Sequence, residues 1–120
     1  MMLYIQECLA DLKNNLPIKD FEIFYELKDD NKTIGFSAFR KSNENPIYIF
    51  VKKEFRGNGY GKFLFSQMFE KLKDLDFNEF IFTFDKNNIP ILRILEYFSA
   101  VHVNTKKNNC TYMIPKDFVI

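Results

Sequence analysis

Three of the chain's four glycines lie within five residues, in the segment RGNGYGK, which we call the glycine loop (Arg56–Lys62). The loop follows a short apolar run and precedes a stretch with helical periodicity. Glycine is costly in chain entropy and is used where the main chain turns sharply or approaches another group closely. Unpaired N–H groups and the positive end of the dipole at a helix start bind anions. The glycine loop therefore predicts a cradle for a diphosphate, and Arg56 and Lys62 are placed to add charge-assisted contacts. The alternative is a tight strand-to-helix connection that binds nothing.

The N-terminal residues have apolar side chains at helical spacing. Ile5, Leu9, Leu12 and Leu16 recur on one side, and Pro17 ends the pattern, which predicts a helix over Leu3–Asn15. Cys8 lies on the same side, so it is expected to be a small buried apolar residue and not a nucleophile.

The middle of the chain predicts strands around a helix. Phe21–Lys28 and residues 33–41 are rich in aromatic and β-branched residues and flank the turn Asp29–Lys32, which indicates an antiparallel hairpin. Ile47–Val51 is suited to a buried central strand. Residues 62–76 carry Leu and Met on one stripe and charged residues on another, as in an amphipathic helix.

The last third predicts a strand, a helix and a hairpin. Glu79–Asp85 alternates, with its phenylalanines on one side. Asn88 is a plausible N-cap for a helix that runs to about Ser99, and Pro90 falls in the first turn, where proline is tolerated. A final hairpin turns around Lys106–Asn109. We expect a single compact α/β domain over residues 1–120, with a mixed, mostly antiparallel sheet and flanking helices.

Composition excludes several classes of partner. The formal net charge of +1 gives no electrostatic case for nucleic acid or a membrane surface. The 15 Phe would suit an RNA-stacking platform, but no strand interleaves them with Lys or Arg, so a core role is favoured. The two cysteines lie far apart and the only histidine is His102, so no metal site is expected. The first residues contain neither a signal peptide nor a membrane span, and we expect a cytoplasmic protein with free thiols.

Two common phosphate-binding loops do not match. A Walker loop ends in Gly-Lys followed by Ser or Thr, whereas Phe63 follows Lys62 here. A dinucleotide fingerprint needs G-x-G-x-x-G in a parallel βαβ unit, whereas the spacing here is G-x-G-x-G.

Arg56, Gly59 and Gly61 occupy the fixed positions of the (Gln/Arg)-x-x-Gly-x-(Gly/Ala) signature, and the loop resembles the acyl-CoA-binding loop of the GNAT N-acetyltransferase superfamily. The segment IYIFVKKEFRGNGYGKFLF is similar to that family's fourth strand, loop and third helix, and DKNNIPILRIL resembles its second motif. The likeness extends from about Phe21 to the C-terminus and implies a GNAT-like fold with a shortened N-terminus.

The resemblance implies acetyl-CoA as the cofactor and acyl transfer to a primary amine of a small molecule or a protein. It places the coenzyme pyrophosphate on the main chain of the glycine loop and the pantetheine arm beside Phe50 and Val51, with Asn88 on the arm's other side. The residues expected in the loop are Arg56, Gly57, Asn58, Gly59, Tyr60, Gly61 and Lys62. The chain is expected to act as a monomer or homodimer. The alternative is a coenzyme A-binding or partner-binding module of the same fold without turnover.

The catalytic groups are less clear. Family members often carry a general-acid tyrosine seven residues beyond the motif asparagine, a position that is Leu95 here. Tyr97 is a substitute candidate, although two residues along a helix rotate it about 200° and ring packing is the simpler role. Asp85 is a candidate base, against its commoner use as a turn or capping residue, and a relayed water is a further alternative.

Overall fold

The computed structural model describes residues 3–7 and 23–116 of the chain. The residues group into two compact units. The first comprises residues up to Arg40 together with Ile47–Glu70, and the second comprises Lys41–Pro46 and the chain from Lys71 onward.

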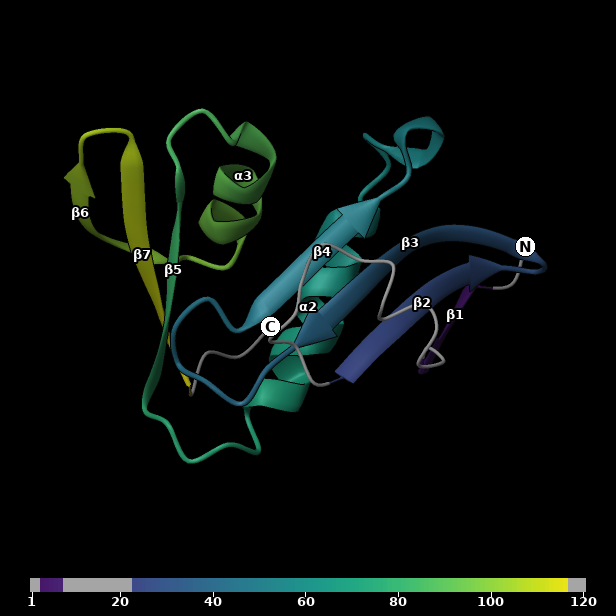
Figure 1. Ribbon diagram of the computed structural model, residues 1–120, viewed down its shortest axis with the longest axis horizontal. Helices are drawn as coiled ribbons and strands as arrows, with labels where there is room; N and C mark the ends of the chain where they lie inside the picture. Colours follow the sequence, from purple (N-terminus) through teal and green to yellow (C-terminus); the bar gives the residue numbers. More distant parts are fainter. Residues whose placement is uncertain (1–2, 8–22, 117–120) are drawn as a thin grey trace. The chain divides into compact units, whose positions relative to one another are not determined.

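The first unit contains a four-stranded antiparallel sheet. Its strands are adjacent in chain order, as Figure 1 shows: β1 (Leu3–Glu7), β2 (Ile23–Asp29), β3 (Lys32–Phe39) and β4 (Ile47–Val51). A short 3-10 turn, η1 (Lys53–Phe55), follows β4, and helix α2 spans Tyr60–Leu72. The predicted hairpin and the strand at Ile47–Val51 are confirmed. The prediction that this strand is buried and central is wrong, because β4 lies at the edge of its sheet and none of its five residues is fully buried. The predicted range for this helix was 62–76. Helix α2 begins two residues earlier than that range begins and ends four residues earlier than it ends.

The prediction of a helix over Leu3–Asn15 is wrong at its start. Residues 3–7 form β1, which pairs antiparallel with β2 from Leu3 opposite Asp29 to Glu7 opposite Tyr25. Tyr and Ile are good strand residues, and pairing with a neighbouring strand outweighed a weak helical pattern. The rest of the predicted helix, including the expected burial of Cys8, lies outside the described residues.

Apolar packing joins α2 to one face of this sheet. Leu27, Ile34 and Leu64 are fully buried in one cluster, and Ile49 and Val51 pack against it half-buried. Side chains alternate across a strand, so Tyr48 and Phe50 lie on the opposite face of β4. The fully buried Met68 continues the stripe of α2 that the sequence predicted.

The second unit contains a three-stranded antiparallel sheet in the order β5-β7-β6. Its strands are β5 (Glu79–Asp85), β6 (Val101–Lys106) and β7 (Asn109–Pro115), and helix α3 spans Ile89–Tyr97. The strands thus form two sheets, where one mixed sheet was predicted. Phe80 and Phe82 are buried, as their alternation predicted. Neither described helix is both long and apolar enough to cross a membrane.

The segment that precedes β4 in the chain also belongs to the second unit. The amide of Ile81 donates to the carbonyl of Asn43 and the amide of Asn45 donates to the carbonyl of Ile81, both at 2.7 Å. The Asn45 side chain accepts a third bond, from the Thr83 amide. These bonds make a short parallel contact, in which Glu44 pairs with Ile81.

We predict that Gly35→Ala destabilises the fold by about 1–3 kcal/mol, since overpacking a tight contact costs this much. A Cβ at Gly35 would lie 3.0 Å from the Cα of Val51 and closer still to the Phe50 carbonyl oxygen, so β3 and β4 would have to separate. Urea unfolding measures the change, and Lys32→Ala, at an exposed position of β3, is the matched control. A Gly35→Ala protein as stable as the control would contradict this account.

Candidate functional site

The backbone of the glycine loop adopts a conformation that requires glycine at two positions. Arg56 is extended, and Gly57 and Gly59 then have φ angles of +83° and +85°. Residues with a Cβ adopt such angles at a cost. A Cβ built on either glycine meets nothing within 4 Å, so packing against the protein does not demand their small size. The backbone is therefore exposed to close approach by another group.

The amides of the loop are the main feature of the site. Within residues 3–7 and 23–116, the main-chain N–H groups of Gly57 to Gly61 have no acceptor. The first helical bond of α2 runs from the Phe63 amide to the Gly59 carbonyl, at 3.1 Å. No acidic side chain lies in the first turn of α2. A helix start with free donors and no competing carboxylate suits an anion.

Neighbouring side chains hold this conformation in ways that the sequence analysis missed. The Asn58 side chain donates from Nδ2 to the carbonyls of Phe55 and Arg56, at 3.1 and 3.4 Å. Phe55 and Tyr60 meet edge to face, with 6.3 Å between ring centroids, and both pack against the core cluster. The two ends of the loop are thus anchored together. Phe55 just before the loop and Tyr60 within it were the available signal.

Phe50 and Val51 direct their main-chain groups to opposite edges of β4. The Lys52 amide donates to the Ile34 carbonyl at 2.9 Å, and because bonds alternate along an antiparallel pair, Phe50 also faces β3. The Val51 carbonyl points to the other edge, where it accepts from Arg56 Nε at 2.9 Å. The pairing of a strand-like ligand with both residues stays a prediction. Of the two, only Val51 has its main-chain groups on the edge away from β3.

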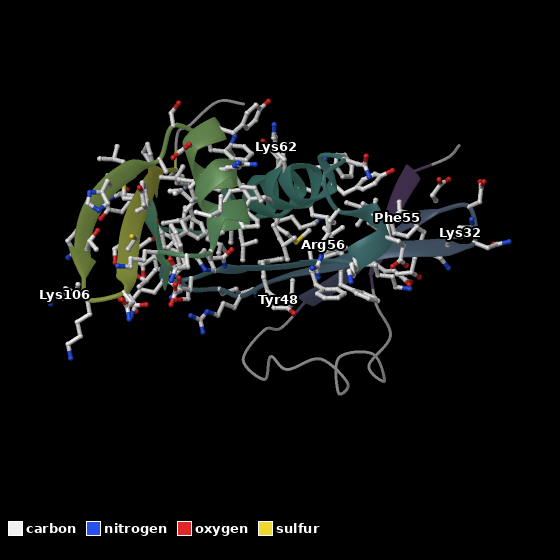
Figure 2. The ribbon with its side chains drawn as sticks, turned by 90° about the horizontal axis from the view of Figure 1, so that it is seen from above. Lys32, Tyr48, Phe55, Arg56, Lys62 and Lys106 are labelled. Carbon is white, nitrogen blue, oxygen red and sulfur yellow. The ribbon has the colours of Figure 1, made fainter. Side chains whose placement is uncertain are left out.

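The two basic residues of the loop point in different directions. Figure 2 shows Arg56 on the side of Tyr48, whereas Lys62 extends away from it beyond α2. The guanidinium carbon of Arg56 lies 5.8 Å from the centre of the Phe50 ring. The side chains of Arg56 and Lys62 therefore do not converge.

Asp85 and Asn88 belong to the second unit and serve the turn that leads into α3. The Asp85 carboxylate accepts from the Asn87 amide at 2.8 Å, which is the turn role weighed against catalysis. Asn88 is the N-cap of α3, as predicted, and its Oδ1 accepts from the Ile91 amide. Its Nδ2 has no acceptor among the described residues. A catalytic Asp85 and a coenzyme contact from Asn88 stay predictions.

Leu95, the position at which the resemblance expects a tyrosine, lies in the last turn of α3. Ser99 has φ +56°, and the Ala100 amide donates to the Leu95 carbonyl, a helix ending in which glycine is common. Leu95 is fully buried. Tyr97 is 56% exposed and meets Phe98 edge to face. Its role as an acid stays a prediction.

Comparison with known families identifies the family to which the chain belongs. The family model described as the Acetyltransferase (GNAT) family matches residues 3–96. The chain belongs to the GNAT acetyltransferase family. The glycine loop lies within the matched residues. No group of three or more His, Cys, Asp or Glu side chains suited to a metal ion occurs among the described residues of this GNAT chain.

Solved structures with low sequence identity share the GNAT fold. The ribosomal-protein-S18-alanine N-acetyltransferase from Escherichia coli is 11% identical with a TM-score of 0.74, over 98% of this chain and 96% of that one. A protein assigned as a streptothricin acetyltransferase from Bacillus anthracis, in complex with acetyl coenzyme A, is 18% identical with a TM-score of 0.72, over 96% and 98%.

A third structure is larger than this chain. A protein from Salmonella typhimurium that is assigned as an acetyltransferase, solved with its cofactor acetyl-CoA, is 11% identical with a TM-score of 0.66. The match covers 79% of this chain and 65% of that protein, so this chain spans about two thirds of its length. A search of curated proteins found no significant match.

Gly59 and Gly61 should respond differently to substitution by alanine. We expect Gly59→Ala to lower the free energy of unfolding by about 1–2 kcal/mol, because φ is +85° there. Gly59→Asn should cost less, because Asn is enriched at positive φ. Gly61 lies inside α2, where Ala is favoured over Gly by about 0.5–1 kcal/mol, so Gly61→Ala is the matched control. Equal effects at both positions, measured by denaturant unfolding, would refute the assigned backbone.

Proposed function

We propose that the chain is an acyl-CoA-dependent N-acyltransferase that moves an acetyl group from acetyl-CoA to a primary amine. The observation that carries the proposal is the run of free amides from Gly57 to Gly61 at the start of α2. Hydrogen bonds from such amides to a charged oxygen contribute about 1.5–3 kcal/mol each. Several together supply enough to hold a diphosphate without a metal ion.

Three further groups are assigned to the coenzyme. The Val51 carbonyl lies on the edge of β4 away from β3, where an extended amide-bearing arm can pair with it as a strand would. The Asn88 Nδ2 is assigned as a donor to that arm. Lys62, exposed in the first turn of α2, adds positive charge near the diphosphate.

Acetyl-CoA supplies an activated thioester carbonyl, and the amine nitrogen replaces the sulfur on that carbon. The chain has to hold the two groups in attack geometry. The Val51 amide shares the outward edge of β4, and we assign it to the negative charge that develops on the carbonyl oxygen. Asp85 or a water accepts the proton from the incoming ammonium, and Tyr97 returns one to the leaving sulfur.

Acetyl-CoA is expected to raise the melting temperature of the protein. At a hundred times its dissociation constant, a ligand that binds only the folded state adds about 2.7 kcal/mol of stability. ATP and NAD, which carry phosphates but no pantetheine arm, should shift the melting temperature less. Equal shifts of the melting temperature with acetyl-CoA, ATP and NAD would contradict the assignment of the coenzyme.

Turnover is then assayed as release of the free coenzyme thiol, with a panel of polyamines, aminoglycosides, amino acids and peptides as acceptors. Acetyl-CoA binding without thiol release on any amine would favour the coenzyme A-binding module over the transferase. Release that depends on one amine class supports the transferase and identifies the class of acceptor.

For an active acceptor, we expect Tyr97→Phe to lower kcat by about 10²-fold or more while KM for acetyl-CoA stays unchanged, because only the proton donor is lost. The substituted ring keeps its edge-to-face contact with Phe98, so the fold should be unaffected. An unchanged kcat would show that the leaving sulfur takes its proton from solvent or from another side chain.

A further inference from the structure

The side chain of Arg56 is engaged with the end of β4. Its Nε donates to the Val51 carbonyl at 2.9 Å, and its guanidinium lies over the Phe50 ring. Between Val51 and Arg56 the chain makes the η1 turn. The bond thus links the end of β4 to the start of the glycine loop, across the η1 turn.

This geometry differs from that of an arginine that grips phosphate. A guanidinium holds a phosphate or carboxylate best through two parallel N–H bonds, and one edge of its fork includes Nε. Here the Nε hydrogen is directed to a main-chain carbonyl. Figure 2 shows the side chain turned toward Tyr48 and away from Lys62. In this structure Arg56 therefore donates to a neutral acceptor of the protein itself, the Val51 carbonyl.

We infer that Arg56 is a positioning residue, which ties the end of β4 to the glycine loop. The tie fixes the spacing between the Val51 main chain and the amides of Gly57 to Gly61. The inference rests on the proposed function, in which one extended coenzyme must meet both groups at once. A carbonyl oxygen has two lone pairs, so the Val51 oxygen can accept from Arg56 and from a ligand amide together.

Three substitutions separate the donor from the charge. Arg56→Gln places Nε2 the same number of bonds from the main chain as the arginine Nε, so it keeps the donor and removes the charge. Arg56→Lys keeps the charge but moves the only donor one bond further out. Arg56→Met has similar length and apolar stem, with neither donor nor charge. Lys32→Gln, at an exposed position of β3, controls for charge removal alone.

The first readout is the dissociation constant of acetyl-CoA, measured by calorimetric titration at low and at high salt. Arg56→Met and Arg56→Lys should each weaken binding by about two- to tenfold, the range of one exposed hydrogen bond. Arg56→Gln should restore affinity to near the wild-type value. The ratio between the Gln and Met variants should not change with salt, because a neutral donor is not screened.

Two outcomes overturn the inference. Retained affinity in Arg56→Lys with loss in Arg56→Gln would mean that charge acts directly on the diphosphate. Tighter binding by Arg56→Met would mean that Arg56 competes with the ligand for the Val51 carbonyl. Each outcome leaves the proposed function intact, since the wild type still binds.

A second readout needs no coenzyme. Hydrogen exchange of the Lys52, Phe55 and Arg56 amides, each of which donates to a main-chain carbonyl, should be faster in the ligand-free Met and Lys variants than in the wild type, and the Gln variant should match the wild type. If the wild type fails to bind acetyl-CoA while this exchange pattern holds, the proposed function fails and the tie stands. Identical exchange in all four proteins refutes the tie by itself.

Discussion

The hydrogen-bond alternation along β4 decides what this site can present to a ligand. The bond from the Lys52 amide to the Ile34 carbonyl sets the phase of β4, by which we mean which of its residues direct their main-chain groups to β3. In this phase Phe50 faces β3 and Val51 faces the other edge. Gly35 makes that phase possible, since any Cβ there would collide with the Phe50 carbonyl. A one-residue slip would turn Val51 inward and leave Phe50 at the edge. The tie from Arg56 and the pairing proposed for the coenzyme arm both depend on this phase.

The binding proposed for this loop relies on main-chain dipoles more than on charged side chains. Exposed charge pairs contribute about 0–1 kcal/mol, whereas a hydrogen bond to a charged group contributes about 1.5–3 kcal/mol. The net charge of +1 is consistent with a site that needs no basic surface. Amides also fix direction, because each N–H points along one line. Two glycines at positive φ hold them so, and the Asn58 carboxamide braces the carbonyls before them.

The sequence predicted the features that local chemistry controls. The strand at Ile47–Val51, the glycine loop, the amphipathic stripe of α2 and the Asn88 cap each follow from residue types over a few positions, and the structure contains all of them. Strand β1 was misjudged because its partner β2 is distant in the chain, and no local pattern reports that pairing. The phase of β4 was equally inaccessible. It depends on register against β3, and an irregularity between Leu27 and Lys28 shifts the register that β3 makes on its other side.

The same distinction explains why the glycine loop is easy to recognise in the sequence and catalytic groups are not. A main-chain amide can donate whatever side chain its residue carries, provided that glycine permits the turn, so the donors of the loop follow from the positions of the glycines. Proton transfer needs a particular side chain at a particular angle. At the position of the family's tyrosine this chain has Leu95, fully buried, and the nearest hydroxyl on α3 is on Tyr97, about 200° around the helix. The loop amides therefore do not depend on which group donates the proton, and a leucine at this position is compatible with a donor on another residue or on water.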